Sequence, residues 1–137
     1  MATSIKDVMT SEVRACEPST TVVEAAKVMA KEDAGSVPVV EDGRLIGILT
    51  DRDIVVRVVA EGRDPTSTMI EEIATRDLVT ASPDDDVDTA LSRMAGSQVR
   101  RIPVVEGDLL VGIVAQADIA RLGSDAKTGE VVEEISR

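Results

Sequence analysis

The residues best suited to chemistry lie in one segment, Gly47–Ile54, where a predicted strand ends directly in a helix start. Thr50 and Asp53 have the spacing of an N-cap and the third helical residue, so both could bind free backbone amides and stabilise the helix by about 0.5–2 kcal/mol. The same groups could instead serve a ligand. A carboxylate here can accept hydrogen bonds from both hydroxyls of a ribose, while the Thr hydroxyl, the amides and Arg52 hold a phosphate. Spacing alone leaves both interpretations open.

A second copy of this segment bears on the choice. Gly112–Asp118 has the same pattern, with Ala115 at the position of Thr50 and Asp118 at the position of Asp53. The capping hydroxyl is lost but the carboxylate is retained. Because the hydroxyl is the better cap, capping alone explains the retained carboxylate poorly. The second copy therefore favours a ligand at this carboxylate.

Both segments belong to a repeat that covers nearly the whole chain. Residue i matches residue i+65 without a gap from Ile5 to about Val56, with 16 identities in about 52 positions. Chance would give roughly three or four identities, so the sequence indicates an internal duplication. In each copy, extended segments alternate with helical periodicity in the order β-α-β-β-α. The elements predicted in the first copy are an extended segment Val13–Cys16, a helix from Val22 with Thr21 and Glu24 as a capping box, strands Val37–Val40 and Leu45–Leu49 around a turn at Asp42–Gly43, and a helix from Asp51 to about Ala60. Those in the second are Leu78–Ala81, a helix capped by Asp86, strands Ile102–Val105 and Leu109–Val114, and a helix from Gln116 to about Leu122.

This order predicts an α/β fold of tandem repeats. A unit of about 55 residues buries little surface alone, so the copies are expected to pack sheet against sheet around a pseudo-two-fold axis. The predicted boundaries are 1–64 for the first repeat, 65–124 for the second and 125–137 for a C-terminal helix or tail. The buried helix faces are expected to include Met29 and Met94.

The composition of the 137-residue chain excludes several classes of function. It has no His, Phe, Tyr or Trp and a formal net charge of −11. Without imidazole the common hydrolytic triads and most zinc sites cannot form, and without aromatic rings or a basic surface no nucleic-acid partner is expected. The acidic run Asp84–Asp88 lacks the Gly and Glu of a calcium loop, so no metal site is predicted. No glycine-rich phosphate loop is present either, and we expect the chain not to be an enzyme.

Cysteine usage and hydropathy predict a cytoplasmic protein without a membrane partner. The single Cys16 cannot form an intrachain disulfide and is expected to be a small packing residue. The longest apolar run, Leu109–Ala115, is far shorter than the roughly 20 residues of a membrane span. No signal segment is recognised after Met1.

The repeat and its motifs resemble a pair of CBS domains, a Bateman module, over about residues 5–122. The resemblance is carried by Val37–Val40 and Ile102–Val105, which both read h-P-V-V, and by the G-h-h-T-x-x-D-h segment at Gly47–Ile54. It is strongest to small stand-alone bacterial and archaeal pairs. It implies two clefts between the copies for adenosine-type ligands (AMP, ADP, ATP, sometimes S-adenosylmethionine or NAD), a homodimer and an unknown effector protein. The implied function is regulatory sensing of energy or stress with no required cofactor; the alternative is a ligand-free structural or interaction dimer with a stress role.

The resemblance also implies site residues. In the first cleft, Asp53 would hold the ribose, with Thr50 and Arg52 at the phosphate or the ribose edge. The base would lie against backbone and aliphatic groups near Ser36, Val37 and the strand Thr75–Val79 of the other copy.

In the second cleft, Asp118 would hold the ribose, and Arg101, directly before Ile102, would face the phosphate. Ala115 departs from the Ser or Thr of the family. The sequence therefore ranks the Thr50/Asp53 cleft as the functional one and the Asp118 cleft as weakened.

Overall fold

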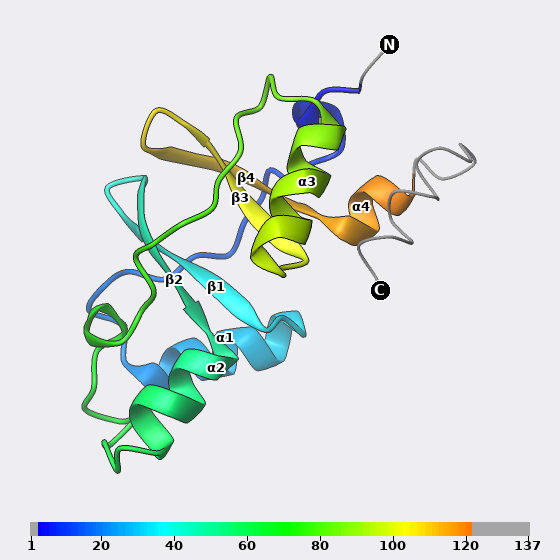
Figure 1. Cartoon of the computed structure of the whole chain (residues 1–137). Coiled ribbons are helices and arrows are strands. Elements are labelled where there is room, and N and C mark those ends of the chain that lie inside the picture. The colour runs from blue at the N-terminus through cyan, green and yellow to red at the C-terminus, as the bar shows by residue number, and fades with distance from the viewer. Residues whose placement is uncertain (1–2, 122–137) are drawn as a thin grey trace. The chain divides into compact units, whose positions relative to one another are not determined.

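The computed structural model describes residues 3–121 and contains two compact units (Figure 1). The Asp53 unit is Arg14–Leu78, and the Asp118 unit is made of residues before Arg14 together with residues after Leu78. The predicted boundary at residue 65 follows the sequence repeat. The compact units divide differently, because the leading segment of each repeat, the residues with which it begins, belongs to the unit of the other repeat. Residues 65–78 belong with the hairpin of the first repeat, and residues 3–13 belong with the hairpin of the second. The predicted C-terminal helix at 125–137 lies outside the described residues.

Each unit contains one α/β repeat in the predicted order. The elements of the Asp53 unit are α1 (Val22–Glu32), β1 (Ser36–Glu41), β2 (Arg44–Thr50), α2 (Asp51–Ile54), a π-helical continuation η2 (Val55–Val59) and a 3-10 turn η3 (Ile70–Glu72). Those of the Asp118 unit are a 3-10 turn η1 (Ile5–Asp7), α3 (Val87–Ser97), β3 (Arg101–Glu106), β4 (Leu109–Ala115) and α4 (Gln116–Ala120). The predicted extended segments form single parallel bridges, Cys16 with Val39 and Ala81 with Val104. None of the helices within residues 3–121 has the length and apolar character needed to cross a bilayer.

Local sequence signals explain how these elements begin and end. The β1–β2 hairpin turns at Asp42 and Gly43, whose φ values of 54° and 81° are those that a tight two-residue turn requires. Thr21 is the N-cap of α1 and accepts a hydrogen bond from the Glu24 amide at 3.3 Å. The Glu24 carboxylate lies 3.8 Å from Lys27 Nζ instead of returning to Thr21, so only half of the predicted capping box forms in the described chain. Asp86 caps α3 as predicted, accepting from the Thr89 amide at 2.9 Å.

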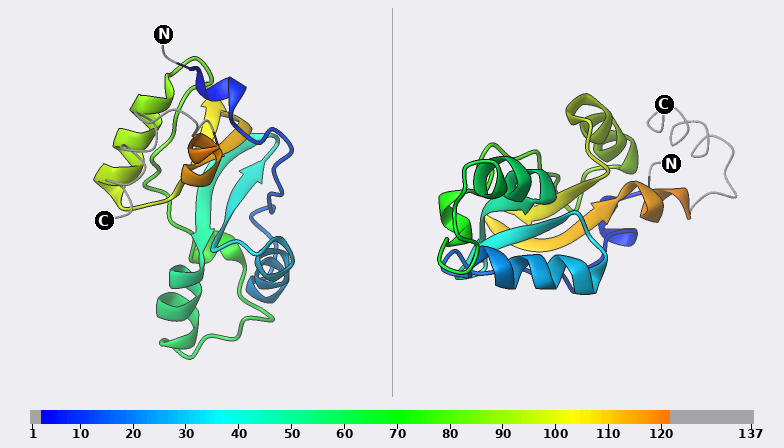
Figure 2. Two further views of the ribbon diagram at one scale, coloured as in Figure 1. Left: turned by 90° about the vertical axis from the view of Figure 1, so that its right-hand side faces the viewer. Right: turned by 90° about the horizontal axis from the view of Figure 1, so that it is seen from below.

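Each unit has its own core. In the Asp53 unit, α1 packs on the β1–β2 hairpin, as two further views show, and buries Met29 against Val37 and Leu49 (Figure 2). In the Asp118 unit, Met94 takes the corresponding place beside Ile102 and Val114. The predicted core role of both methionines is confirmed. Cys16 is buried as a packing residue, and burial raises the pKa of its thiol although nearby Arg14 acts in the opposite direction.

The exchanged leading segments dock against a glycine in each hairpin. Thr75 pairs with Ile48 through two backbone hydrogen bonds of 2.8 and 2.9 Å, and Thr10 pairs with Ile113 at 2.8 and 2.9 Å. A Cβ on Gly47 would lie 3.1 Å from the Thr75 carbonyl oxygen, and a Cβ on Gly112 would lie 2.9 Å from the Thr10 carbonyl oxygen. The repeated glycine therefore allows the backbone of the docked segment to approach.

Alanine substitution tests this docking. Gly112→Ala is expected to lower the free energy of unfolding by about 1–3 kcal/mol because the docked backbone must move, and Gly47→Ala by less. Urea unfolding followed by circular dichroism measures both effects. Gly96→Ala is the matched control, since its added methyl meets nothing within 4 Å in α3 and should stabilise the protein by about 0.5–1 kcal/mol. Equal effects at Gly112 and Gly96 would contradict the docking argument.

Candidate functional site

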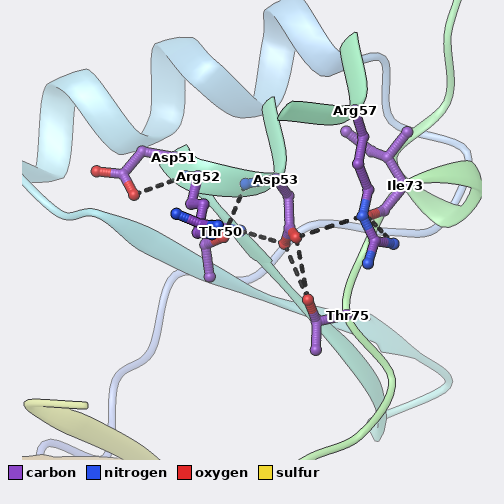
Figure 3. Close-up of polar contacts among 7 residues, drawn as sticks. All are labelled: Thr50, Asp51, Arg52, Asp53, Arg57, Ile73 and Thr75. Carbon is purple, nitrogen blue, oxygen red and sulfur yellow. Dashed lines mark hydrogen bonds and ion pairs between the residues drawn. The ribbon is translucent and has the colours of Figure 1, made fainter. Parts of the chain in front are cut away.

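The first candidate site lies at the junction of β2 and α2. Thr50 ends the strand in an extended conformation and Asp51 begins the helix. The Asp53 amide donates to Thr50 Oγ1 at 3.0 Å, and the Thr50 amide donates to Asp53 Oδ2 at 3.0 Å (Figure 3). The capping geometry predicted from the spacing is therefore present, and it fixes the direction in which the Asp53 carboxylate points.

Thr75 reaches the same carboxylate from the docked segment. Its hydroxyl donates to Asp53 Oδ1 at 3.0 Å and to Oδ2 at 3.2 Å (Figure 3). The backbone pairing of Thr75 with Ile48 holds the segment beside β2. The sequence associated Thr75 with the base of a ligand, whereas the structure brings it into direct contact with Asp53.

Arg57 is a member of this site that the sequence reasoning missed. Its Nε lies 3.9 Å from Asp53 Oδ1, and its Nη1 donates to the Ile73 carbonyl oxygen at 3.2 Å. Arg57 lies on the π-helical turn η2. Its side chain links the Asp53 carboxylate to the docked segment. The signal that could have found it is the i, i+4 spacing of Asp53 and Arg57 on a helix.

The Asp53 carboxylate is shielded from water but has polar partners. Its side chain is only 9% exposed and faces the Thr50 amide, the Thr75 hydroxyl and the Arg57 guanidinium. Arg52, by contrast, is exposed, and its guanidinium makes no hydrogen bond or ion pair within residues 3–121; only its amide is engaged, with Asp51 Oδ1 at 2.8 Å. Arg52 is therefore free to meet an anion, and Arg57 is not.

The other residues predicted for the first site divide between the units. Ser36 is the cross-strand partner of Thr50 and lies at the same end of the hairpin. Val37 is buried in the core. Val79 belongs to the Asp118 unit, where it packs against the core.

The second candidate site repeats the junction with fewer contacts. The Ala115 amide donates to Asp118 Oδ2 at 3.0 Å, and Arg121 Nη1 lies 3.8 Å from Oδ1. The Asp118 side chain is 15% exposed. Arg101 is the cross-strand partner of Ala115, and its exposed guanidinium has no partner among the described side chains. Ile102, like Val37, is buried in the core.

The acidic run before α3 is used for local structure. Asp84 pairs with Lys6 at 3.3 Å, and Asp85 accepts from the Ser82 amide at 2.9 Å. The pKa of Asp86 is lowered, mainly by a hydrogen bond from the Thr89 amide and to a lesser extent by one from the Thr89 hydroxyl. Over residues 3–121 there is no group of three His, Cys, Asp or Glu side chains that could hold a metal ion.

Comparison with known proteins gives the family. The sequence matches the CBS domain family over residues 5–60 and again over 70–125. It is 44% identical over 117 residues to the CBS domain-containing protein YhcV of Bacillus subtilis, covering 85% of this chain and 83% of YhcV. It is 38% identical over 120 residues to Hypoxic response protein 1 of Mycobacterium tuberculosis, covering 87% of this chain and 84% of that protein.

Solved structures agree with the sequence matches. The crystal structure of Hypoxic Response Protein I with two coordinated zinc ions is similar with a TM-score of 0.79 at 38% identity, over 87% of this chain and 98% of that one. The CBS domain pair of protein MJ0100, in complex with 5′-methylthioadenosine and S-adenosyl-L-methionine, is similar with a TM-score of 0.77 at 32% identity, over 90% of this chain and 98% of that one. The repeat, the two strand-to-helix junctions and these matches together establish that the chain belongs to the CBS domain family and contains a tandem pair of its domains.

Proposed function

We propose that the protein is a regulatory CBS pair that binds an adenine nucleotide of the AMP, ADP or ATP type through Asp53 and Asp118, as a sensor of energy or stress. The observation that carries this proposal is a carboxylate fixed at the start of a helix in each unit, by the Thr50 amide in one and the Ala115 amide in the other. A carboxylate held in one direction can accept both hydroxyls of a ribose.

The ligand class is supported by a relative and by a nearby cation. The MJ0100 pair is described with two ligands that both contain adenosine. In this chain, Arg101 stands across the strand pair from Ala115, next to the junction that carries Asp118, and its guanidinium is exposed. Arg52 follows Asp51 in the other unit and is also exposed. Each carboxylate thus has an exposed guanidinium nearby that can bind a phosphate: Arg52 precedes Asp53 in the sequence, and Arg101 is paired across the strands with Ala115.

Thermal unfolding in the presence of ligand tests the proposal. AMP, ATP and S-adenosylmethionine would be added separately to the purified protein. A ligand at about 100 times its dissociation constant stabilises the folded state by roughly 2.7 kcal/mol, which is on the order of ten degrees for a chain of this size. The double variant Asp53→Asn/Asp118→Asn should lose the shift. No shift with any of the three ligands would contradict the proposal.

We further propose that the protein is regulatory and not catalytic, and that it acts in the cytoplasm through an unidentified effector protein. The polar groups around Asp53 are engaged with one another in a capping arrangement, which suits binding and shape change better than proton transfer. The buried thiol of Cys16, whose pKa is raised by burial, suits a reducing compartment.

A homodimer is the proposed assembly, formed through the valine surface of Val55, Val56 and Val59. These side chains are 58%, 46% and 69% exposed and lie on the single helical turn η2. Three neighbouring apolar side chains that face water are better covered than exposed. A second copy of the chain provides the same surface, so the pair can close on itself around a two-fold axis.

The alternative is a ligand-free structural or interaction dimer with a stress role, and one observation favours it. Both oxygens of Asp53 already accept hydrogen bonds inside the protein, as a purely structural cap would. Under this alternative, AMP, ATP and S-adenosylmethionine leave the melting temperature unchanged in the wild type and in every carboxylate variant.

A further inference from the structure

The Thr75 hydroxyl occupies the part of Asp53 that a ribose would need. It lies 3.0 Å from Oδ1 and 3.2 Å from Oδ2, so it occupies the outward edge of the carboxylate, which is the edge that runs from one oxygen to the other. Two adjacent hydroxyls that bind a carboxylate together use this same edge. The Thr50 amide takes another position on Oδ2, and Arg57 Nε at 3.9 Å faces Oδ1. In the free protein the binding edge of Asp53 is therefore already engaged.

Asp118 differs at this edge. Its Oδ2 accepts from the Ala115 amide at 3.0 Å, and its Oδ1 has only the long ion pair with Arg121 at 3.8 Å. Thr10 is the repeat counterpart of Thr75 and pairs with Ile113 through its backbone as Thr75 pairs with Ile48. Its side chain is exposed, and among the residues that the structure describes no hydroxyl bonds to Asp118. The outward edge of Asp118 thus has no hydrogen-bond donor within this part of the chain.

We propose that Thr75 is an internal competitor for the Asp53 carboxylate, so that a ribose-bearing ligand binds first at Asp118 and reaches Asp53 only when the Thr75 hydroxyl turns away. This inference rests on the proposed function. It reverses the order that the sequence predicts, which ranks the Asp53 site first because Thr50 is present and Ala115 has replaced its counterpart. Thr50 contributes a cap, but the residue that governs access is Thr75.

The expected size of the effect follows from the competing hydrogen bond. A ligand that binds only one conformer has an apparent dissociation constant equal to its intrinsic constant divided by the fraction of molecules in that conformer. A hydrogen bond to a charged group is strong enough to hold the open fraction at about a tenth or less. Removing the Thr75 hydroxyl should therefore strengthen binding at Asp53 at least about tenfold.

Isothermal titration of the full chain with AMP tests the inference. The wild type is expected to show one tighter site per chain, and Thr75→Val a second site strengthened by about tenfold or more. Thr75→Ser keeps the hydroxyl and should behave as the wild type. Thr10→Val is the matched control in the other unit and should leave AMP binding unchanged, because its hydroxyl makes no bond to Asp118.

Carboxylate variants assign the sites. Asp118→Asn should remove the tighter wild-type event, and Asp53→Asn added to Thr75→Val should remove the gained one. Weaker or unchanged binding in Thr75→Val would overturn the inference, as would a wild-type event that Asp53→Asn abolishes and Asp118→Asn preserves; both results leave the proposed function standing. If Thr75→Val does not fold, the two single Asn variants still decide the order. Absence of AMP binding in the wild type and in Thr75→Val would overturn both proposals.

Discussion

Replacing Asp53 with alanine is expected to lower the free energy of unfolding by about 2–4 kcal/mol, whereas Asp118→Ala should lower it by about 1 kcal/mol. The Asp53 carboxylate is 9% exposed and accepts from both the Thr50 amide and the Thr75 hydroxyl, so its removal leaves two shielded donors without their acceptor. Asp118 is more exposed, and its removal frees only the Ala115 amide. Arg57 and Arg121 contribute little to either value because both side chains are at least half exposed and their ion pairs are 3.8–3.9 Å long.

Urea unfolding of the two alanine variants beside the wild type measures this difference. Asp53→Asn is the informative companion, since it keeps one acceptor oxygen but no charge, and should fall between the wild type and Asp53→Ala. Adding Thr75→Val to Asp53→Ala should restore a large part of the lost free energy of unfolding, because it removes the hydroxyl that Asp53→Ala leaves without an acceptor. The two substitutions are therefore expected to be non-additive, since they share one hydrogen bond. Equal losses in Asp53→Ala and Asp118→Ala would mean that the Thr75 contact adds nothing to the cap.

The substitution Val59→Lys is expected to dissociate the proposed homodimer, raising its dissociation constant by at least about 100-fold. Val59 is the most exposed member of the valine surface, at 69%. In a two-fold interface each substitution occurs twice, so two apolar contacts are lost and two ammonium groups lose water or repel each other. A loss of about 2.7 kcal/mol suffices for that factor.

Sedimentation equilibrium at micromolar concentration distinguishes dimer from monomer. Val99→Lys is the matched control: Val99 is 38% exposed and lies in the Asp118 unit, outside the valine surface. It should leave the mass unchanged. If the Val59→Lys protein remains dimeric, the interface does not lie at η2.

Much of each repeat could be predicted from the sequence because its determinants are local. The Asp42–Gly43 turn and the alternation around it predict the hairpin Ser36–Thr50 to within a residue at each end. The Thr50 to Asp53 spacing predicts the two reciprocal hydrogen bonds that the structure contains. The α/β class and the CBS pair are likewise confirmed, since they depend on motifs that occur twice.

What the sequence did not predict depends on contacts between distant residues. The hydroxyl of Thr75 lies on Asp53 because residues 70–75 dock beside β2, and no local pattern specifies that docking. Arg57 has the i, i+4 spacing of a helical partner of Asp53, but the spacing does not show that its guanidinium also reaches the Ile73 carbonyl oxygen in the docked segment. The sequence places Val37 and Ile102 near the ligand, and the structure buries both side chains in the cores together with the next two residues of each strand.

The exchange of leading segments has a consequence for how the chain is made. During synthesis, residues 14–78 emerge as one continuous stretch and can close their unit as soon as the docked segment has left the ribosome. Residues 3–13 are made before that unit, yet their hairpin partner, β4, ends only at Ala115. Residues 3–13 must therefore wait for the last strand of the described chain before they can pair. The Asp118 unit should complete its folding later than the Asp53 unit, at a rate limited by closure of that long loop.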